Sequence, residues 1–337
     1  MPYLIGTDEA GYGPNLGPLV ISASVWEVPD GVRSEDLYQL LHGVISCGAG
    51  TPRARSGTGR ASGEDGPAVV MADSKSLYQS GKGLQRLEQG LWAAFALLGR
   101  QPRAWSEVWE LLAPGCGDQR RAALCEADDD HRLPIHADPE ETGRMAAAVC
   151  RGVATSRVRL AALHSRVVFP AEFNEAVSRF GSKGTALSRW TLDLVGRMIE
   201  SLPAGPVSVL CDKHGGRDRY LPLLMDSFPG AFIEVRAEGR RQSIYRFALN
   251  GRSSAEASVE ICFQAKGEGL LPAALASMAS KYLRELAMQA LNAYWCSKVA
   301  DLLPTAGYPN DALRFHTQIA TIQKELGIED HVLWRIK

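Results

Sequence analysis

Four acidic residues stand at or just beyond the ends of β-prone segments, each with a glycine close by in the sequence. They are Asp8, Glu9, Asp212 and Glu268. Hard divalent cations such as Mg²⁺ and Mn²⁺ take oxygen ligands, and they need only a few carboxylates besides water and phosphate oxygens. Two such ions about 3.5–4 Å apart can activate a water molecule and stabilise the leaving oxygen of a phosphodiester. Acids that converge at neighbouring strand ends therefore indicate metal-dependent phosphodiester cleavage.

The first two of these acids belong to the segment DEAGYGP, which follows an apolar strand. Any single acid at a strand end can be a solvated turn residue. The glycines and prolines around Asp8 and Glu9, however, are too specialised for an ordinary turn. Successive strand residues point to opposite faces, so both acids can face one site only where the strand ends. Gly11 permits such an ending.

Alternating strands and helices must position the acids. Runs of β-prone residues predict strands at 2–7, 18–26, 103–112, 157–169, 208–211, 231–237, 243–249 and 257–264. Helical spacing predicts helices at 34–46, from ADSKSL to about 98, near 140–152, and at 171–201, 217–228, 270–299 and 311–325. This alternation is typical of the α/β class with a mixed sheet.

Composition places the chain among ordinary globular proteins, with 45% hydrophobic and 22% charged residues. The formal net charge of −1 provides no global basic field, so nucleic-acid binding must rely on local basic patches and on metal ions. No apolar run approaches the ~18–20 residues of a membrane span. Seven scattered cysteines without a CxxC pair, and no signal peptide, predict reduced thiols and a cytoplasmic protein.

The segment GTDEAGYGPNLGPLVISA resembles the opening motif of type 2 ribonuclease H, the ribonuclease HII family. Six further segments are similar to that family in the same order. They are ADSKSL at 72–77, FNEA at 173–176, VLCDK at 209–213, AKGEG at 265–269, AALASMASKYLRE at 273–285 and GYP at 307–309. The short motifs are weak one by one, whereas the first is specific on its own. The chain therefore resembles a divergent, longer member of this family.

The resemblance implies a ribonuclease H-like α/β fold, in which helices flank a mixed central sheet. The catalytic domain would span 1–302, with inserted segments at about 48–67, 100–155 and 229–256. Residues 303–337 would form a C-terminal helical segment.

The resemblance also implies an endoribonuclease that hydrolyses the RNA strand of RNA/DNA hybrids with two Mg²⁺ or Mn²⁺ ions, leaving 5′-phosphate and 3′-hydroxyl ends. Carried over residue by residue, the catalytic metal ligands are Asp8, Glu9, Asp212 and Glu268. The substrate-binding residues carried over are Gly11, Tyr12, Gly13, Lys75 and Tyr308. The backbone of the glycine turn would approach the ribose 2′-hydroxyl, Lys75 would neutralise a phosphate, and Tyr308 would pack on a sugar. No obligate protein partner is inferred.

Three residues depart from the family pattern. Tyr12 stands where arginine is usual, Glu268 replaces an aspartate, and Glu285 replaces an aspartate after the long helix. The Tyr12 change alters one phosphate or ribose contact, and the Glu268 change lengthens one ligand arm by a methylene. Two alternatives follow: a ribonuclease H-fold nuclease for another structured nucleic acid, or a catalytically weak protein that binds hybrids.

Several other polar residues have simpler interpretations beside functional ones. Asp73 is either a helix N-cap or a functional acid. His214 is expected on the surface, with a hydrogen-bonding role near the site as the alternative. His131, beside the acids at 128–130, is expected on a solvated loop rather than in a metal site. Arg236, Arg240, Arg241 and Arg246 form either a solvated face or a track for phosphates. Trp105, Trp109 and Trp190 are expected to pack in the interior.

Overall fold

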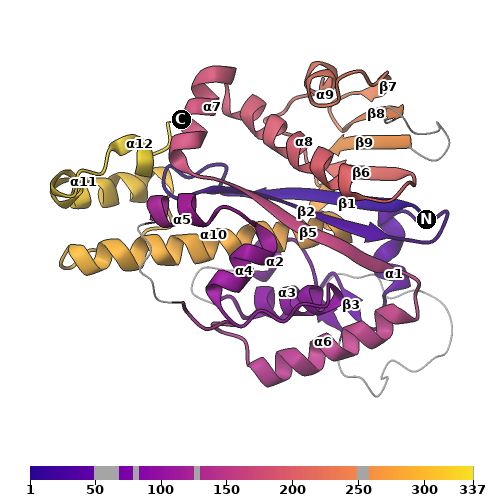
Figure 1. Ribbon diagram of the computed structural model, residues 1–337, viewed down its shortest axis with the longest axis horizontal. Coiled ribbons are helices and arrows are strands. Elements are labelled where there is room, and N and C mark those ends of the chain that lie inside the picture. The colour runs from indigo at the N-terminus through magenta and orange to yellow at the C-terminus, as the bar shows by residue number, and fades with distance from the viewer. Residues whose placement is uncertain (49–67, 79–82, 125–129, 249–257, 337) are drawn as a thin grey trace.

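The apolar segments of the chain form a seven-stranded sheet in the computed structural model (Figure 1). In sheet order the strands are β5 (Arg159–Val168), β2 (Leu19–Glu27), β1 (Tyr3–Ala10), β6 (Val207–Cys211), β9 (Ser258–Gln264), β8 (Gln242–Ala248) and β7 (Glu234–Glu238). β1, β6 and β9 run parallel to one another, whereas β2 and β8 are antiparallel to both of their neighbours. The sheet is mixed, and the predicted α/β class is confirmed.

The structure describes residues 1–48, 68–78, 83–124, 130–248 and 258–336. All but the first residue of the predicted insertion 48–67 therefore lies outside the described residues. The helices of the described part begin with the 3₁₀ turn η1 (Ser34–Asp36), α1 (Leu37–Leu40), α2 (Ser74–Leu77), α3 (Gln85–Leu97), α4 (Trp105–Leu112), α5 (Gly117–Leu124) and α6 (Pro139–Ala154). They continue with α7 (Pro170–Phe180), α8 (Lys183–Ser201), α9 (Leu221–Ser227), the 3₁₀ turn η2 (Gly267–Gly269), α10 (Leu271–Lys298), α11 (Pro309–Glu325) and α12 (Asp330–Leu333).

Helices cover both faces of the sheet: α7, α8 and α9 lie on one side, and α3, α6 and α10 on the other (Figure 1). Alternation along β1 divides its side chains between two cores. Leu4 packs in the core on the α10 side, and Ile5 packs in the core on the α8 side. Because both faces are covered, the central strands are apolar on both sides.

The predicted strand at 103–112 is wrong, because this segment forms helix α4. Its buried residues are Trp105, Val108, Trp109 and Leu112. These positions follow the i, i+3, i+4, i+7 spacing of an amphipathic helix, which the β-prone side chains disguise. The expected interior position of the tryptophans is confirmed, since Trp105 and Trp109 are buried and their rings stack at 6.1 Å.

The predicted insertion 229–256 contains two strands of the main sheet. β7 and β8 pair with each other, and β8 pairs along its whole length with β9. The segment therefore extends the sheet at one edge. The predicted insertion 100–155 supplies α4, α5 and α6, which lie on the α10 side. A small second sheet joins β3 (Ile45–Ser46) and β4 (Val69–Val70).

The C-terminal helices pack against the far half of α10 and form a third core with Leu16, which follows β1. Leu16 also bridges to Trp334, so the last residues of the chain lie beside the turn after β1. Figure 1 places α11 and α12 at the end of the sheet opposite the N-terminus. Throughout the described part of the chain, no helix has the length and apolar character needed to cross a membrane.

Candidate active site at the carboxyl ends of the central strands

The carboxyl ends of β1, β6 and β9 lie at the same edge of the sheet, because the three strands are parallel neighbours. Gly6 of β1 pairs with Leu210 of β6, so Asp8 and Asp212 each lie two residues beyond a paired position. Asp212 directly follows β6, and Glu268 lies in η2 after β9. The fold therefore brings Asp8 at the end of β1 together with the ends of two strands whose acids, Asp212 and Glu268, lie more than 200 residues further along the sequence.

β1 does not end at its acidic pair. Asp8 pairs with Ser22 of β2 and Glu9 with Ile21, and the strand continues to Ala10, directly before Gly11. By alternation Asp8 shares the α10 face with Leu4, whereas Glu9 shares the α8 face with Ile5. The two acids are therefore divided between the faces at the end of the strand.

The carboxylates nevertheless act on one another electrostatically. Burial, followed by the charge of Glu9, raises the pKa of Asp8 well above its usual range. Burial and then the charge of Asp212 raise the pKa of Glu9 to about 7, with a further contribution from Glu268. Burial and the charge of Glu268 raise the pKa of Asp212. Each acid therefore lies in the field of at least one other, and the protein does not balance their charges fully.

Lys75 is the lysine that faces these acids. Partial burial lowers its pKa, but the charges of Asp73, Asp8, Glu268 and Asp212 together raise it above the ordinary value. The carboxylate of Asp73 accepts a hydrogen bond from the Lys75 amide at 3.3 Å and another from Ser277 Oγ at 3.0 Å. Asp73 thus caps α2 and ties it to α10, which is the helix-capping interpretation.

A divalent cation fits the chemistry of this donor set. Among the described residues, no three His, Cys, Asp or Glu side chains are grouped closely enough to hold a metal ion as they stand. The four acids offer only oxygen, the ligand type that Mg²⁺ and Mn²⁺ prefer. Glu268 Oε2 is buried and has no hydrogen-bond partner. A cation would satisfy this oxygen and reduce the mutual repulsion that raises the pKa of Glu9 and Asp212.

Two buried arginines, Arg284 and Arg335, contact the glycine turn after β1. Gly11 has a φ of 89°, which favours glycine, and a Cβ there would lie 2.6 Å from Arg284 Nε. Arg335 Nη2 donates a hydrogen bond to the Gly11 carbonyl at 2.7 Å. Gly13 is exposed, and nothing lies within 4 Å of the position of a Cβ. The turn therefore has a fixed base and an open outer side.

Tyr308 lies close to the same turn. The backbone N–H of Asn15 donates a hydrogen bond to the Gly307 carbonyl at 2.8 Å, and a Cβ on Gly307 would lie 2.7 Å from the Leu16 carbonyl. The Tyr308 side chain is 56% exposed and available to a ligand. Sequence reasoning missed Arg335, which the fold brings to Gly11 from the end of the chain, and nothing in its local sequence distinguishes it.

Tyr12 contacts a lysine that the motifs do not identify. The Lys183 ammonium lies 4.8 Å from the centroid of the Tyr12 ring. Burial and the charge of Glu9 raise the pKa of Tyr12, which places the phenol within the field of that acid. The tyrosine thus lies next to both an acid of the proposed site and a basic residue at the start of α8.

His214 is not on the surface, contrary to expectation. Its side chain is 3% exposed, and its Nδ1 lies 3.0 Å from Ser188 Oγ. Burial, with a smaller effect from Arg217, lowers the pKa of His214 to about 3. The imidazole is therefore neutral at physiological pH, and it packs among Tyr220 and Phe263.

The arginine cluster lies in the β7–β8 hairpin, whose turn contacts the segments that carry Glu268 and Asp212. The Arg241 carbonyl accepts a hydrogen bond from the Ala265 amide at 3.2 Å, and the Gly239 carbonyl accepts one from Lys213 Nζ at 2.6 Å. Arg236 forms an ion pair with Glu234 at 3.0 Å in the β7–β8 hairpin. Glu238 of the same hairpin accepts a hydrogen bond from Tyr245 at 2.6 Å. His131 packs against Trp105, and Asp128 and Asp129 fall outside the described residues.

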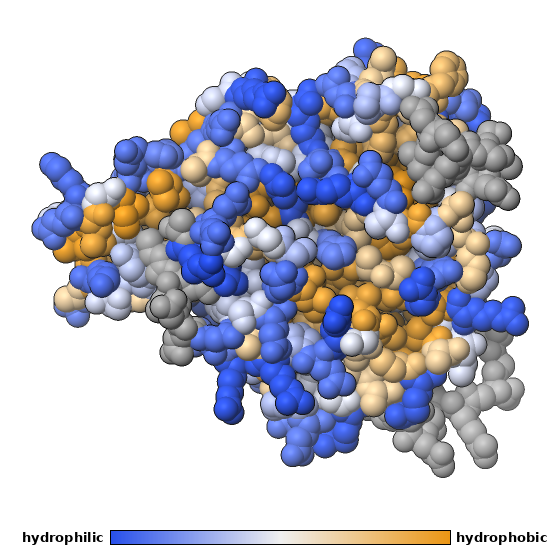
Figure 2. Space-filling model, in the orientation of Figure 1, coloured by the Kyte–Doolittle hydropathy of each residue, from blue (hydrophilic) through white to orange (hydrophobic). Residues whose placement is uncertain are grey.

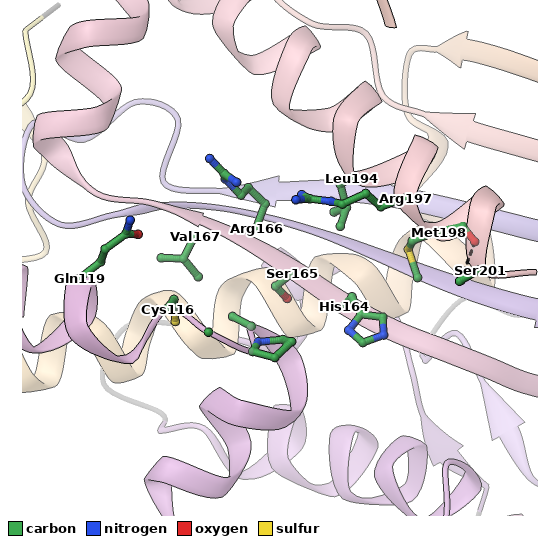
Figure 3. Close-up of a pocket in the computed structure, with 13 residues that line it drawn as sticks. Cys116, Gln119, His164, Ser165, Arg166, Val167, Leu194, Arg197, Met198 and Ser201 are labelled. Atoms are coloured by element: carbon green, nitrogen blue, oxygen red, sulfur yellow. Dashed lines mark hydrogen bonds between the residues drawn. The ribbon is translucent and has the colours of Figure 1, made fainter. Parts of the chain in front are cut away.

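A separate cavity of about 470 Å³ lies along the edge strand β5 (Figure 3). Arg166 of β5 and Arg197 of α8 line it, and both are already paired with carboxylates, Glu172 and Asp193. The face in Figure 2 shows hydrophilic residues together with apolar surface between β5 and α6. None of the predicted site residues lines this cavity, so it is distinct from the candidate active site.

No protein-family model and no curated protein matches the sequence. Among solved structures, ribonuclease H2 from Pyrococcus horikoshii OT3 is similar over 98% of this chain and 92% of its own, with 14% identity and a TM-score of 0.42. Bst-RNase HIII in complex with Mn²⁺ is similar over 99% of this chain and 65% of its own, with 14% identity and a TM-score of 0.41. The RNase HII of a PCNA complex from Archaeoglobus fulgidus is similar over 99% of this chain and 94% of its own, with 13% identity and a TM-score of 0.40. All three of these solved structures are of ribonucleases H.

Proposed function

We propose that this protein is a metal-dependent endoribonuclease that hydrolyses the RNA strand of RNA/DNA hybrids. The observation that carries the proposal is the set of acids at three neighbouring strand ends, where burial and neighbouring carboxylates raise the pKa values of Asp8, Glu9 and Asp212. Clustered acids without enough positive charge disfavour the folded state unless a cation binds. The motifs that resemble type 2 ribonuclease H support the same reaction.

Asp8, Glu9, Asp212 and Glu268 would hold one or two Mg²⁺ or Mn²⁺ ions. Bound there, such ions supply an activated water molecule and charge stabilisation for the leaving 3′-oxygen. The carboxylates position and charge the site, and Lys75 moderates their repulsion, because its charge lowers the pKa of Glu9. The products would carry 5′-phosphate and 3′-hydroxyl ends, as the resemblance implies.

The glycine turn would provide the selection for RNA. The open side at Gly13 lets a ribose approach the backbone closely, and a 2′-hydroxyl can both donate and accept a hydrogen bond there. The Gly11 carbonyl already accepts from Arg335, which keeps the turn in one conformation. Tyr308, exposed beside the turn, would pack on the neighbouring sugar.

The decisive experiment compares uniformly labelled RNA/DNA, DNA/DNA and RNA/RNA duplexes with and without a chelator. Cleavage of the RNA/DNA hybrid alone, abolished by EDTA and restored by Mg²⁺ or Mn²⁺, is the expected result. Cleavage of RNA/RNA or DNA/DNA instead would support a nuclease for another structured nucleic acid. Binding of the hybrid without cleavage in either metal would reduce the protein to a hybrid-binding role.

A further inference from the structure

Two lysines near the candidate site each lie over a tyrosine ring, but only one of them has its charge balanced. Lys281 Nζ lies 4.1 Å from the centroid of the Tyr78 ring and 2.6 Å from Glu285 Oε1. Lys183 Nζ lies 4.8 Å from the centroid of the Tyr12 ring, and no carboxylate of the described residues forms an ion pair with it. The positive charge of Lys183 is therefore available to a ligand.

Tyr12, whose ring lies under Lys183, is positioned both by its backbone and by contacts of its phenol oxygen. Its backbone belongs to the glycine turn that directly follows β1. A Cβ on Gly184 would lie 3.6 Å from Tyr12 Oη, and one on Gly215 would lie 3.8 Å from it. The phenol therefore packs against the start of α8 and the loop after β6, which follows Asp212.

A second basic residue lies beside Lys183. Arg217 Nη2 donates a hydrogen bond to Thr185 Oγ1 at 2.8 Å, in the first turn of α8. The start of α8 is thus a basic edge beside an acidic site.

We propose that Lys183, held over Tyr12, binds a backbone phosphate of the hybrid next to the scissile bond. This inference rests on the proposed function and identifies a substrate contact for it. A polyanion approaching the carboxylates is repelled unless nearby cations receive its phosphates, and an unpaired lysine beside the glycine turn is suited to do so. Tyr12 acts as a positioning residue, because its ring places the ammonium without contacting the phosphate itself.

The first test measures hybrid binding in EDTA, where no cleavage occurs, by fluorescence anisotropy over a range of salt concentrations. Lys183→Gln should raise the Kd about tenfold and reduce the slope of log K against log salt by about one. Lys183→Arg keeps the charge and should bind within a few-fold of the natural chain. Lys298→Gln is the matched control, since Lys298 lies over Tyr294 at 5.7 Å at the far end of α10 and should bind normally.

The second test locates the phosphate. A hybrid with one neutral methylphosphonate within about two nucleotides of the cleavage site removes one charge at a time. The substitution at the contacted position should weaken binding by the natural chain about tenfold, yet leave binding by Lys183→Gln unchanged. Tyr12→Ala should resemble Lys183→Gln, whereas Tyr12→Phe keeps the ring and should bind normally.

An unchanged Kd and salt slope for Lys183→Gln would overturn the inference, as would a loss no larger than that of Lys298→Gln. Thermal unfolding of each variant separates a lost contact from a damaged fold, and Lys183→Arg keeps the test informative if the glutamine variant unfolds. The proposed function fails separately. If hybrid binding depends on Lys183 but no cleavage occurs in Mg²⁺ or Mn²⁺, the nuclease activity is ruled out and the phosphate contact stands. If cleavage occurs but neither binding nor cleavage changes in Lys183→Gln, the nuclease activity stands and the phosphate contact is ruled out. If the protein does not bind the hybrid at all, both proposals are overturned.

Discussion

Two regions of this protein bury glutamate or aspartate, and they treat the carboxylate in opposite ways. Glu88 of α3 is 0% exposed, and its two oxygens accept hydrogen bonds from the amides of Ile135, His136 and Ala137 at 2.6–2.8 Å and from Tyr282 at 3.0 Å. At the strand ends, Glu268 keeps a buried oxygen without any hydrogen-bond partner. The protein's own donors satisfy both oxygens of Glu88, whereas they leave one buried oxygen of Glu268 unsatisfied.

Under the proposed function, the difference separates a structural acid from a metal ligand. Glu88 fastens the segment 135–137 to the core, so its charge is balanced within the fold. Backbone hydrogen bonds from Lys213 and Lys266 lower the pKa of Asp212, but burial and the charge of Glu268 outweigh them. Burial and the neighbouring acids likewise raise the pKa of Glu9. Buried acids that the fold does not neutralise are candidates for binding or catalysis, because they lower the stability of the free protein.

Asp8→Asn should have the largest effect and test the functional side of the comparison directly. The change removes one charge of the proposed metal site and keeps the size of the side chain. We expect cleavage of an RNA/DNA hybrid to fall at least ~1000-fold, or about 4 kcal/mol of barrier, while binding of the hybrid stays largely intact. Single-turnover cleavage and anisotropy measure the two quantities. Activity within a few-fold of the natural chain in Mg²⁺ or Mn²⁺ would rule out these ligands.

Glu88→Gln should have the opposite profile. The amide keeps one acceptor oxygen but cannot accept all four hydrogen bonds. We therefore expect the free energy of unfolding, measured with urea, to fall by about 2–4 kcal/mol. The hybrid-cleavage rate of the folded variant should stay within a few-fold. Glu140→Gln is the control, because Glu140 is exposed and its nearest arginine lies 3.8 Å away. Equal stability of the two variants would remove the structural half of the comparison.

Divalent cations should stabilise the protein through the strand-end acids alone. At a concentration about 100 times its Kd, a cation that binds only the folded state adds about 2.7 kcal/mol. Thermal unfolding with Mg²⁺ or Mn²⁺ should show this gain in the natural chain and in Glu88→Gln, but a much smaller one in Asp8→Asn. A gain that survives Asp8→Asn in full would place the cation elsewhere.

The smallest effect should come from replacing Tyr12 with arginine, which adds a positive charge beside the acidic site. We expect the natural chain to cleave a single ribonucleotide in DNA less well than a run of ribonucleotides, because an isolated ribonucleotide offers few other contacts. Tyr12→Arg removes the ring beneath Lys183, so it should weaken hybrid binding as Tyr12→Ala does. It should nevertheless raise kcat/KM on the single ribonucleotide relative to kcat/KM on the run by about tenfold, the worth of roughly 1.5 kcal/mol from a charge-assisted hydrogen bond. Equal rates of the natural chain on both substrates would show that Tyr12 is not the determinant.

The sequence by itself determined the class of the fold and the position of the acids along the chain. The period-2 and period-3.6 spacing of apolar residues is a local property, and it predicts β1, β2, β6, β9 and α10 within a few residues of their observed bounds. The acids of DEAG, LCDK and KGEG stand next to those strands, so their place at strand ends also follows from local order. At 103–112 the β-prone side chains predict a strand, whereas the spacing of the apolar residues is that of a helix. Packing against the core favours the helix, and the segment forms α4.

Only the tertiary structure decided which charges are balanced. The neighbours of Lys75 come from three strand ends, Tyr12 meets Lys183 from a helix 171 positions on, and Gly11 meets Arg335 from 324 positions on. His214 is likewise buried by residues that are distant in sequence, such as Phe263. Burial and Coulomb interactions depend on distance in space and not on order along the chain. The residue types can therefore be found in the sequence, whereas their charge states and partners emerge only when the strands are brought side by side.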